Sequence, residues 1–262
     1  MGNSTLQAPL LVSFSGLDGS GKSTQMESLG AALHAAGLTT RRLAFWDDVV
    51  VGVKYREGFV HKVYKSERGI GAPGKPVNRR DKNMRGWHLT LVRHFLYLLD
   101  AINLRRVIAR EKKTARKTAR QRDLTAVNRG GYAWAGTTNR GATDVILFDR
   151  YIYDELANLN LQNPLSRAFF RLVRSFTPRP DIAYLLDADP AAACARKPEY
   201  PVDFMKQCRR SYFELATLLG NMTVIPALNL PEARRAVLQA AAQRLAAAGR
   251  RVDLVSGSVS VA

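Results

Sequence analysis

The sequence predicts an α/β fold in which a doubly wound parallel sheet is flanked by helices. Apolar stretches of strand length alternate along the chain with segments of helical periodicity, an order typical of such folds. Two of the stretches, Val145–Phe148 and Ile182–Leu186, are continuous and are each followed by an aspartate, as expected of strands buried on both faces. A third, Pro9–Phe14, runs through a glycine-rich loop into a helix. Ligands of doubly wound sheets bind at the carboxyl ends of the strands.

The first half of this pattern begins with a strand at Pro9–Phe14 and a helix whose apolar residues recur from Met26 to Ala36. Gly37 stands where a helix C-cap glycine belongs, and Thr39–Trp46 indicates a second strand. From about residue 47 to 85, glycines, prolines and scattered charges break the periodicity. We expect an irregular insertion there.

Helical periodicity returns at Leu89 and continues into the basic segment Arg105–Arg122, which holds nine Lys or Arg residues and one Glu. A second irregular insertion is expected at about 111–142. After the two apolar strands, a last short strand at Met222–Ile225 precedes an amphipathic helix from about Pro231 to Ala248.

The composition sets further bounds. With 262 residues, of which 46% are hydrophobic, the chain can bury a substantial core. We expect one domain over residues 1–249 and a disordered tail over 250–262. No run approaches the roughly 18 apolar residues of a membrane helix, and no signal-peptide pattern opens the chain. The two cysteines have no metal-binding spacing, so we expect a cytoplasmic protein without a membrane partner, a disulfide or zinc.

The charge balance implies an anionic partner, because 40 Lys and Arg residues against 22 Asp and Glu give a net charge of +18. Nucleotides, nucleic acid and an acidic membrane surface all fit such a charge, and the charge alone does not choose among them.

The glycine-rich loop carries the most specific chemistry. It satisfies G-x-x-x-x-G-K-[ST] between a strand and a helix, the context expected of a phosphate-binding P-loop. Backbone N–H groups and the helix N-terminus would surround the phosphates of ATP, Lys22 would reach the β and γ phosphates, and Ser23 would hold Mg²⁺. The predicted ATP-binding residues are Gly16, Leu17, Asp18, Gly19, Ser20, Gly21, Lys22, Ser23 and Thr24. The fold is therefore expected to be of the P-loop NTPase type.

A second group of polar residues follows the strand at Val145–Phe148. Asp149 and Arg150 would emerge at the rim of the sheet beside the phosphate loop. An aspartate there can hold the metal or its waters, and the planar guanidinium of Arg150 suits a second phosphate group.

Several segments together resemble the thymidylate kinase family. The loop Phe14–Thr24, including the carboxylate of Asp18, is similar to that family's phosphate loop, and Asp144–Tyr151 is similar to its strand followed by Asp-Arg-Tyr. Pro180–Pro190 resembles its P-D-x-x-x-x-L-D-x-x-P strand, and Phe204–Ala216 the helix after its lid. These segments span most of the chain in the family's order, with two long departures.

The resemblance implies roles for individual residues. Asp18 would approach the sugar of the acceptor, Arg150 would hold its phosphate, and Asp149 would lie near the metal. Tyr151 would contact the acceptor beside Arg150. Arg196 would belong to a short lid over ATP and supply the cation of the transition state, because the loop itself carries no arginine. The implied catalytic residues are Lys22, Asp149, Arg150 and Arg196.

The departures concern the acceptor. Tyr97 takes the place of the family's base-stacking aromatic residue, although a core tyrosine explains it equally well. Four residues later, Ala101 replaces an arginine that contacts thymine, and Asp154 replaces a serine.

We therefore expect Mg²⁺-dependent phosphoryl transfer from ATP to a nucleoside monophosphate, first of all dTMP to dTDP. A kinase of the same fold acting on a nucleoside or another small phosphorylated metabolite is the first alternative. A nucleic-acid-binding P-loop ATPase is the second. For Arg105–Arg122 a solvated helix extension is favoured over nucleic-acid contact, and a homodimer is left open.

Overall fold

The computed structural model describes residues 8–52, 87–128, 143–198, 200–250 and 252–254. Its centre is a five-stranded parallel sheet in the order β2-β3-β1-β4-β5. The strands are β1 (Leu10–Gly16), β2 (Thr40–Ala44), β3 (Val145–Asp149), β4 (Ile182–Leu186) and β5 (Met222–Ile225). The predicted α/β fold with a parallel sheet and flanking helices is confirmed.

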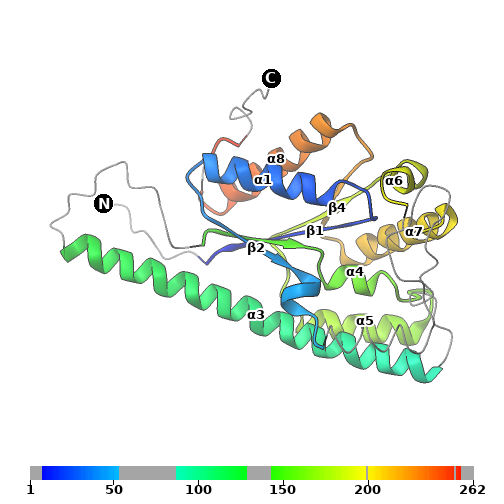
Figure 1. Ribbon diagram of the computed structural model, residues 1–262. Helices are drawn as coiled ribbons and strands as arrows, with labels where there is room; N and C mark the ends of the chain where they lie inside the picture. Colours follow the sequence, from blue (N-terminus) through cyan, green and yellow to red (C-terminus); the bar gives the residue numbers. More distant parts are fainter. Residues whose placement is uncertain (1–7, 53–86, 129–142, 199, 251, 255–262) are drawn as a thin grey trace.

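Helices cover both faces of the sheet (Figure 1). On one face lie α1 (Lys22–Ala35) and α8 (Leu230–Ala247), and on the other lie α3 (Trp87–Asn128), α4 (Ile152–Leu156), α5 (Pro164–Phe176) and α7 (Val202–Leu219). The short α6 (Pro190–Arg196) precedes α7. Alternate residues of a strand point to opposite faces, so Val145 and Leu147 pack in the core with α1 and α8, while Ile146 and Phe148 pack in the core with α3 and α4.

The direction of the chain after each strand creates a crevice at one end of the sheet. After β1 the chain passes to the face of α1, whereas after the neighbouring β3 it passes to the face of α4. Phe14 of β1 pairs with Asp149 of β3, so the loop after β1 and the residues after β3 leave the sheet side by side. Ligand sites of doubly wound sheets lie at such divergence points.

The second strand is shorter than predicted. It ends at Ala44, and Phe45–Val49 form a single π-helical turn, η1, closed by the bond from the Val50 N–H to the Phe45 carbonyl. Asp48 accepts a hydrogen bond from the backbone N–H of Ala44, which holds the turn against the strand end. The apolar Phe45–Trp46 pair gave no sign of this in the sequence. Most of the predicted insertion at 47–85 lies outside the described residues.

The second predicted insertion is wrong in its first part. Helix α3 has 42 residues and continues to Asn128, so residues 111–128 are helical and only 129–142 lie outside the described residues. The basic side chains had obscured the helix, whose buried apolar positions are Tyr97, Ala101, Leu104, Ile108 and Ala115. Their spacings of three, four and seven residues keep them on one side of a helix.

The disordered tail predicted from residue 250 is also wrong in part. Arg250 forms an ion pair of 3.2 Å with Asp144, and Leu254 is buried in the core beside α8. The few apolar residues of this glycine- and serine-containing tail show no periodicity, so the burial of Leu254 was not predictable from the sequence. Across the described part of the chain, no helix is long and apolar enough to cross a membrane.

Candidate functional site

The loop between β1 and α1 depends on its glycines. Gly16, Gly19 and Gly21 have φ angles of 140°, 80° and 87°, in a region that side chains disfavour. A Cβ on Gly16 would lie 2.4 Å from the Leu186 carbonyl oxygen, and one on Gly19 would lie 2.5 Å from the Ala193 carbonyl oxygen. The loop therefore packs directly against the end of β4 and against α6.

Lys22 begins α1 and folds back over this loop. Its Nζ donates hydrogen bonds to the carbonyl oxygens of Gly16 at 2.9 Å and Leu17 at 2.6 Å, and the residue is only 7% exposed. Burial, with a further contribution from the nearby charge of Arg150, lowers the pKa of Lys22 to about 8. A cation held without full hydration interacts strongly with any anion that approaches the loop.

Arg150 follows β3 in an unusual backbone conformation. Its φ of 62° is the one positive φ of a non-glycine residue in the described chain. The guanidinium pairs with Asp18 of the loop, and its Nη1 lies 3.5 Å from a carboxylate oxygen of Asp154. Burial acts to lower the pKa of Arg150, but Asp154 and Asp18 outweigh it, so the pKa is raised and the charge is permanent.

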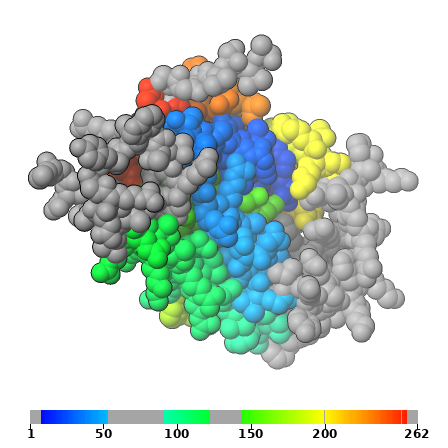
Figure 2. Space-filling model, turned by 60° about the vertical axis from the view of Figure 1, so that its left-hand side comes forward, coloured from blue at the N-terminus to red at the C-terminus, as the bar shows by residue number. Residues whose placement is uncertain are grey.

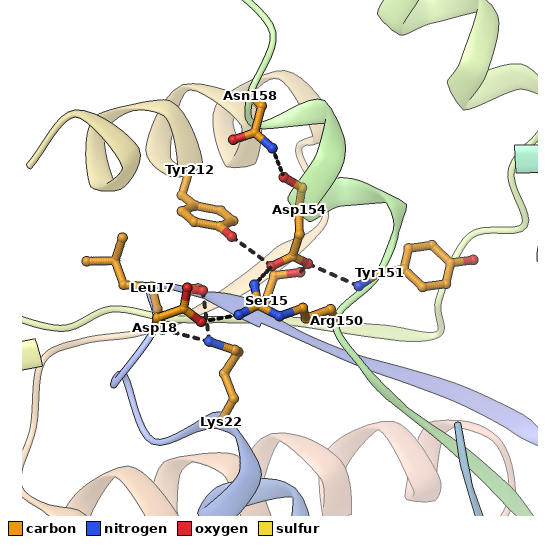
Figure 3. A network of polar contacts seen from close by, with 10 residues as sticks. Ser15, Leu17, Asp18, Lys22, Arg150, Tyr151, Asp154, Asn158 and Tyr212 are labelled. Carbon is orange, nitrogen blue, oxygen red and sulfur yellow. Dashed lines mark hydrogen bonds and ion pairs between the residues drawn. The ribbon is translucent and has the colours of Figure 1, made fainter. Parts of the chain in front are cut away.

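Asp154, on α4, is the centre of a buried network (Figure 3). Its carboxylate accepts hydrogen bonds from the Ser15 hydroxyl at 2.7 Å, the Tyr212 hydroxyl at 2.7 Å and the Tyr151 backbone N–H at 3.0 Å. Arg150 is the fourth partner. The carboxylate, which belongs to α4, thus joins β1, α7 and the residues that follow β3. This network fixes the direction in which the Arg150 guanidinium points.

A cleft of about 230 Å³ opens beside this network. The glycine-rich loop and Arg150 form one side, and α7, the segment between α4 and α5, and Arg93 of α3 form the others. Its polar lining residues are Asp18, Arg93, Arg150, Asn158, Asn160, Gln207, Ser211 and Tyr212. The cleft therefore offers cations, an anion and neutral hydrogen-bonding groups beside the loop that Lys22 contacts.

The other residues predicted to bind ATP or the metal lie around the carboxyl end of the sheet. Ser23 and Thr24 are exposed in the first turn of α1, and the Nε of Arg196 donates a hydrogen bond of 2.8 Å to the Gly19 carbonyl. Asp149 is half-buried at the end of β3, and its carboxylate has no hydrogen bond or ion pair with another described residue. Asp187 at the end of β4 differs, because Arg209 binds both its oxygens at 2.7 Å.

Asp149 and the Ser23 hydroxyl are thus the groups that suit Mg²⁺ here. No group of three or more metal-binding side chains occurs among the residues that the structure describes. That donor set still fits Mg²⁺ with a nucleotide, because this ion is usually held by one or two protein oxygens together with phosphates and water. The two metal-binding assignments stay predictions.

Two residues predicted to contact the acceptor lie in the core instead of on the cleft surface. Tyr97 is 5% exposed, and burial, followed by the charge of Glu155, raises its pKa well above the usual value. Tyr151 is fully buried and donates its hydroxyl to the Pro178 carbonyl at 2.6 Å. Neither side chain is among the residues that line the cleft.

The sequence did not single out Asp154, Ser15, Tyr212 or Arg93 as site residues. Asp154 stood out only as a departure from the thymidylate kinase pattern. The signal for Ser15 was a polar residue inside an apolar strand, which a buried partner explains. Arg93 lies one turn before Tyr97 in a helix rich in basic residues, so nothing in the sequence separated it from the others.

The fold and the loop together define an α/β protein with a glycine-rich loop at the carboxyl end of a five-stranded parallel sheet. The chain matches no protein-family model, and no curated protein matches it. The family is therefore not identified, and the resemblance to thymidylate kinases stays a prediction.

Proposed function

We propose that this protein transfers the γ-phosphoryl group of ATP to a small phosphorylated acceptor, and that a nucleoside monophosphate, first of all dTMP, is that acceptor. The observation that carries the proposal is the buried Lys22, which lies on a glycine-rich loop at the start of α1. Phosphoryl transfer depends almost wholly on positioning and charge stabilisation, and a partly desolvated lysine beside oriented N–H groups supplies both.

The reaction would run between the loop and the cleft. An oxygen of the acceptor attacks the γ-phosphorus of ATP, the bond from that phosphorus to the β–γ bridging oxygen breaks, and ADP leaves. Lys22 would stabilise the charge that develops on the phosphate oxygens. Arg196 would assist from the α6 side, a role supported by its hydrogen bond to the Gly19 carbonyl of the loop. Mg²⁺, when bound by Ser23 and Asp149, would neutralise charge on the phosphates of ATP.

The cleft is the proposed acceptor site. It shares Gly16, Leu17 and Asp18 with the loop, so a bound acceptor would lie next to the phosphates. Arg150 would hold the phosphate of the acceptor and Asp18 would contact its sugar. The predicted base-stacking role of Tyr97 has no support from its buried position.

One observation favours a nucleoside or another uncharged acceptor as the second candidate. Arg150 already faces two carboxylates, Asp18 and Asp154, which would repel an incoming phosphate dianion. An acceptor hydroxyl would instead find Asp18 as a hydrogen-bond partner.

A panel of acceptors decides between these functions. Purified protein is incubated with ATP and Mg²⁺ and with dTMP, dUMP, dCMP, AMP, thymidine or deoxycytidine, and ADP formation is measured beside the Lys22→Ala variant. Turnover with a nucleoside monophosphate supports the first proposal, and turnover with nucleosides alone supports the second. No acceptor-dependent turnover above the Lys22→Ala level would refute both.

A further inference from the structure

The second half of α3 presents exposed cations to solvent, and five of them form a row along one side of the helix. Arg106, Arg110, Lys113, Lys117 and Arg120 are all exposed, and their spacings alternate between four and three residues. At about 100° per residue, the five side chains fall within an arc of about 80°. We call these five residues the basic row.

The basic row lies opposite the side of α3 that packs in the core. The buried apolar positions of the helix have a mean direction about 180° from that of the row; they are Tyr97, Ala101, Leu104, Ile108 and Ala115. One side of the helix therefore packs in the core, and the opposite side exposes the basic row to solvent. Figure 1 shows this half of α3 running out along the edge of the molecule, away from the end of the sheet that carries the glycine-rich loop. In the view of Figure 2, its green atoms lie at the lower left surface.

No acidic side chain compensates the basic row within the described chain. Glu111 is the one acidic residue between 101 and 121, and it turns toward Arg41 of β2, with which it pairs at 3.8 Å. None of the five row residues has an ion pair with another described residue. Five like charges on one helix side cost folding free energy through i,i+4 repulsion, which a polyanion would relieve.

The charge run alone favoured a solvated helix extension, but because the described cations line up on one side without acidic partners, we propose that the basic row binds the phosphate backbone of a nucleic acid. The row extends over 14 helical rises, or about 21 Å, which is the axial length of about six nucleotides of one strand in a B-form duplex. Five guanidinium and ammonium groups over that length match the density of the phosphates. Contacts of this kind carry no base specificity, so the site would bind nucleic acid of any sequence.

The same residues fit a membrane surface less well. A helix that lies on a membrane needs apolar side chains along the length that carries its cations. Between residues 105 and 121 no large apolar side chain is exposed. The exposed Leu91, Val92 and Phe95 lie near the other end of α3, with Phe95 about 16 Å along the axis from Arg106.

The test compares two variants of the full chain that have the same net charge. In the row variant, all five row residues are changed to Gln. The matched control changes five exposed arginines that are scattered over α5, α7, α8 and the segment before β4, namely Arg171, Arg179, Arg210, Arg235 and Arg244. Each variant removes five positive charges from the same starting value of +18. Circular dichroism and thermal unfolding verify that both are folded.

The probe is a fluorescent 24-base-pair DNA duplex, whose binding is followed by anisotropy between 50 and 200 mM NaCl. Five phosphate contacts predict a slope of log K against log salt near −4.5, or a loss of about 500-fold across that range. We expect the row variant to lose at least about 100-fold in affinity at 100 mM NaCl and most of this slope, while the control stays close to the unchanged protein.

Three outcomes would overturn the proposal. An equal loss in both variants would mean that net charge alone attracts the duplex. Absence of binding by the unchanged protein at 100 mM NaCl would mean that the row is a solvated surface. Binding of vesicles of phosphatidylserine and phosphatidylcholine that depends on the row, without duplex binding, would assign it to membranes. None of these results depends on whether the protein is a kinase.

Discussion

Replacement of Asp154 by alanine tests whether the buried carboxylate holds the site together. The change removes the acceptor of the Ser15 and Tyr212 hydroxyls and of the Tyr151 N–H, all at buried residues. Each unsatisfied group costs about 1–3 kcal/mol, and loss of one partner of a buried ion pair typically costs about 3–5 kcal/mol. These costs overlap, so we expect a loss of about 3–5 kcal/mol in the free energy of unfolding.

A loss of that size lowers the melting temperature by about 6–20 °C in a domain of this length. Thermal unfolding at pH 7 without nucleotide measures it. The matched control is Asp203→Asn, which removes an exposed carboxylate paired at 3.0 Å with Lys206 and is expected to cost less than about 0.5 kcal/mol. If Asp154→Ala lowers the melting temperature no more than this control, the network does not stabilise the fold and the reasoning is wrong.

Asparagine at position 154 is expected to be almost as costly as alanine. Its amide offers one oxygen, and its NH₂ must face either the Arg150 guanidinium or the Tyr151 N–H, both of which only donate. The hydroxyls of Ser15 and Tyr212 are able to reverse their hydrogen bonds and accept from the amide. The Arg150 guanidinium and the Tyr151 N–H are not. A melting temperature of Asp154→Asn close to that of the unchanged protein would show that the carboxylate charge is dispensable.

The remaining predictions concern the loop and the acceptor. We expect Lys22→Ala to lower kcat at least about 100-fold without changing the fold. In the unchanged protein, kcat/KM for ATP should fall as pH rises through about 8, because burial lowers the pKa of Lys22 to that value and only the protonated lysine attracts phosphate. A pH profile that is flat to pH 9.5 would contradict this. Arg150→Ala should raise KM for a phosphorylated acceptor about 10- to 100-fold with little change for ATP, and equal effects on both would place Arg150 elsewhere. Gly19→Ala should destabilise the fold by more than Gly21→Ala, because both have positive φ but only Gly19 would bring its Cβ against Ala193; equal unfolding temperatures would refute this steric argument.

The sequence was most informative where local pattern and tertiary environment agree. The continuous apolar runs of β3 and β4 predicted buried parallel strands because both faces of those strands are covered. Glycines also marked the loop after β1, where Gly16 and Gly19 stand at positions at which any Cβ would collide with backbone. The position of Arg150 beside the loop was predicted from the end of its strand, whereas its ion pair with Asp18 was not predicted.

The rest depended on contacts between distant segments. Tyr212 and Asp154 are 58 residues apart, and only the packing of α7 on α4 shows that they share a hydrogen bond. Likewise, Tyr97 occupied a position that suggests base stacking, but the helix turns this side chain into the core. The length of α3 was missed because exposed charges outnumber the few apolar residues that anchor its second half.

The close approach of Gly19 to α6 bears on the timing of catalysis. In many phosphoryl-transfer enzymes a segment must close before the reacting groups meet, and that motion limits the rate. Here Gly19 has no side chain, so the Ala193 backbone can lie against the loop. Arg196, on the next turn of α6, donates a hydrogen bond to the Gly19 carbonyl oxygen. If the loop binds ATP as proposed, the arginine on the α6 side is in place before the nucleotide arrives. Turnover would then be paced by the chemical step or by departure of ADP.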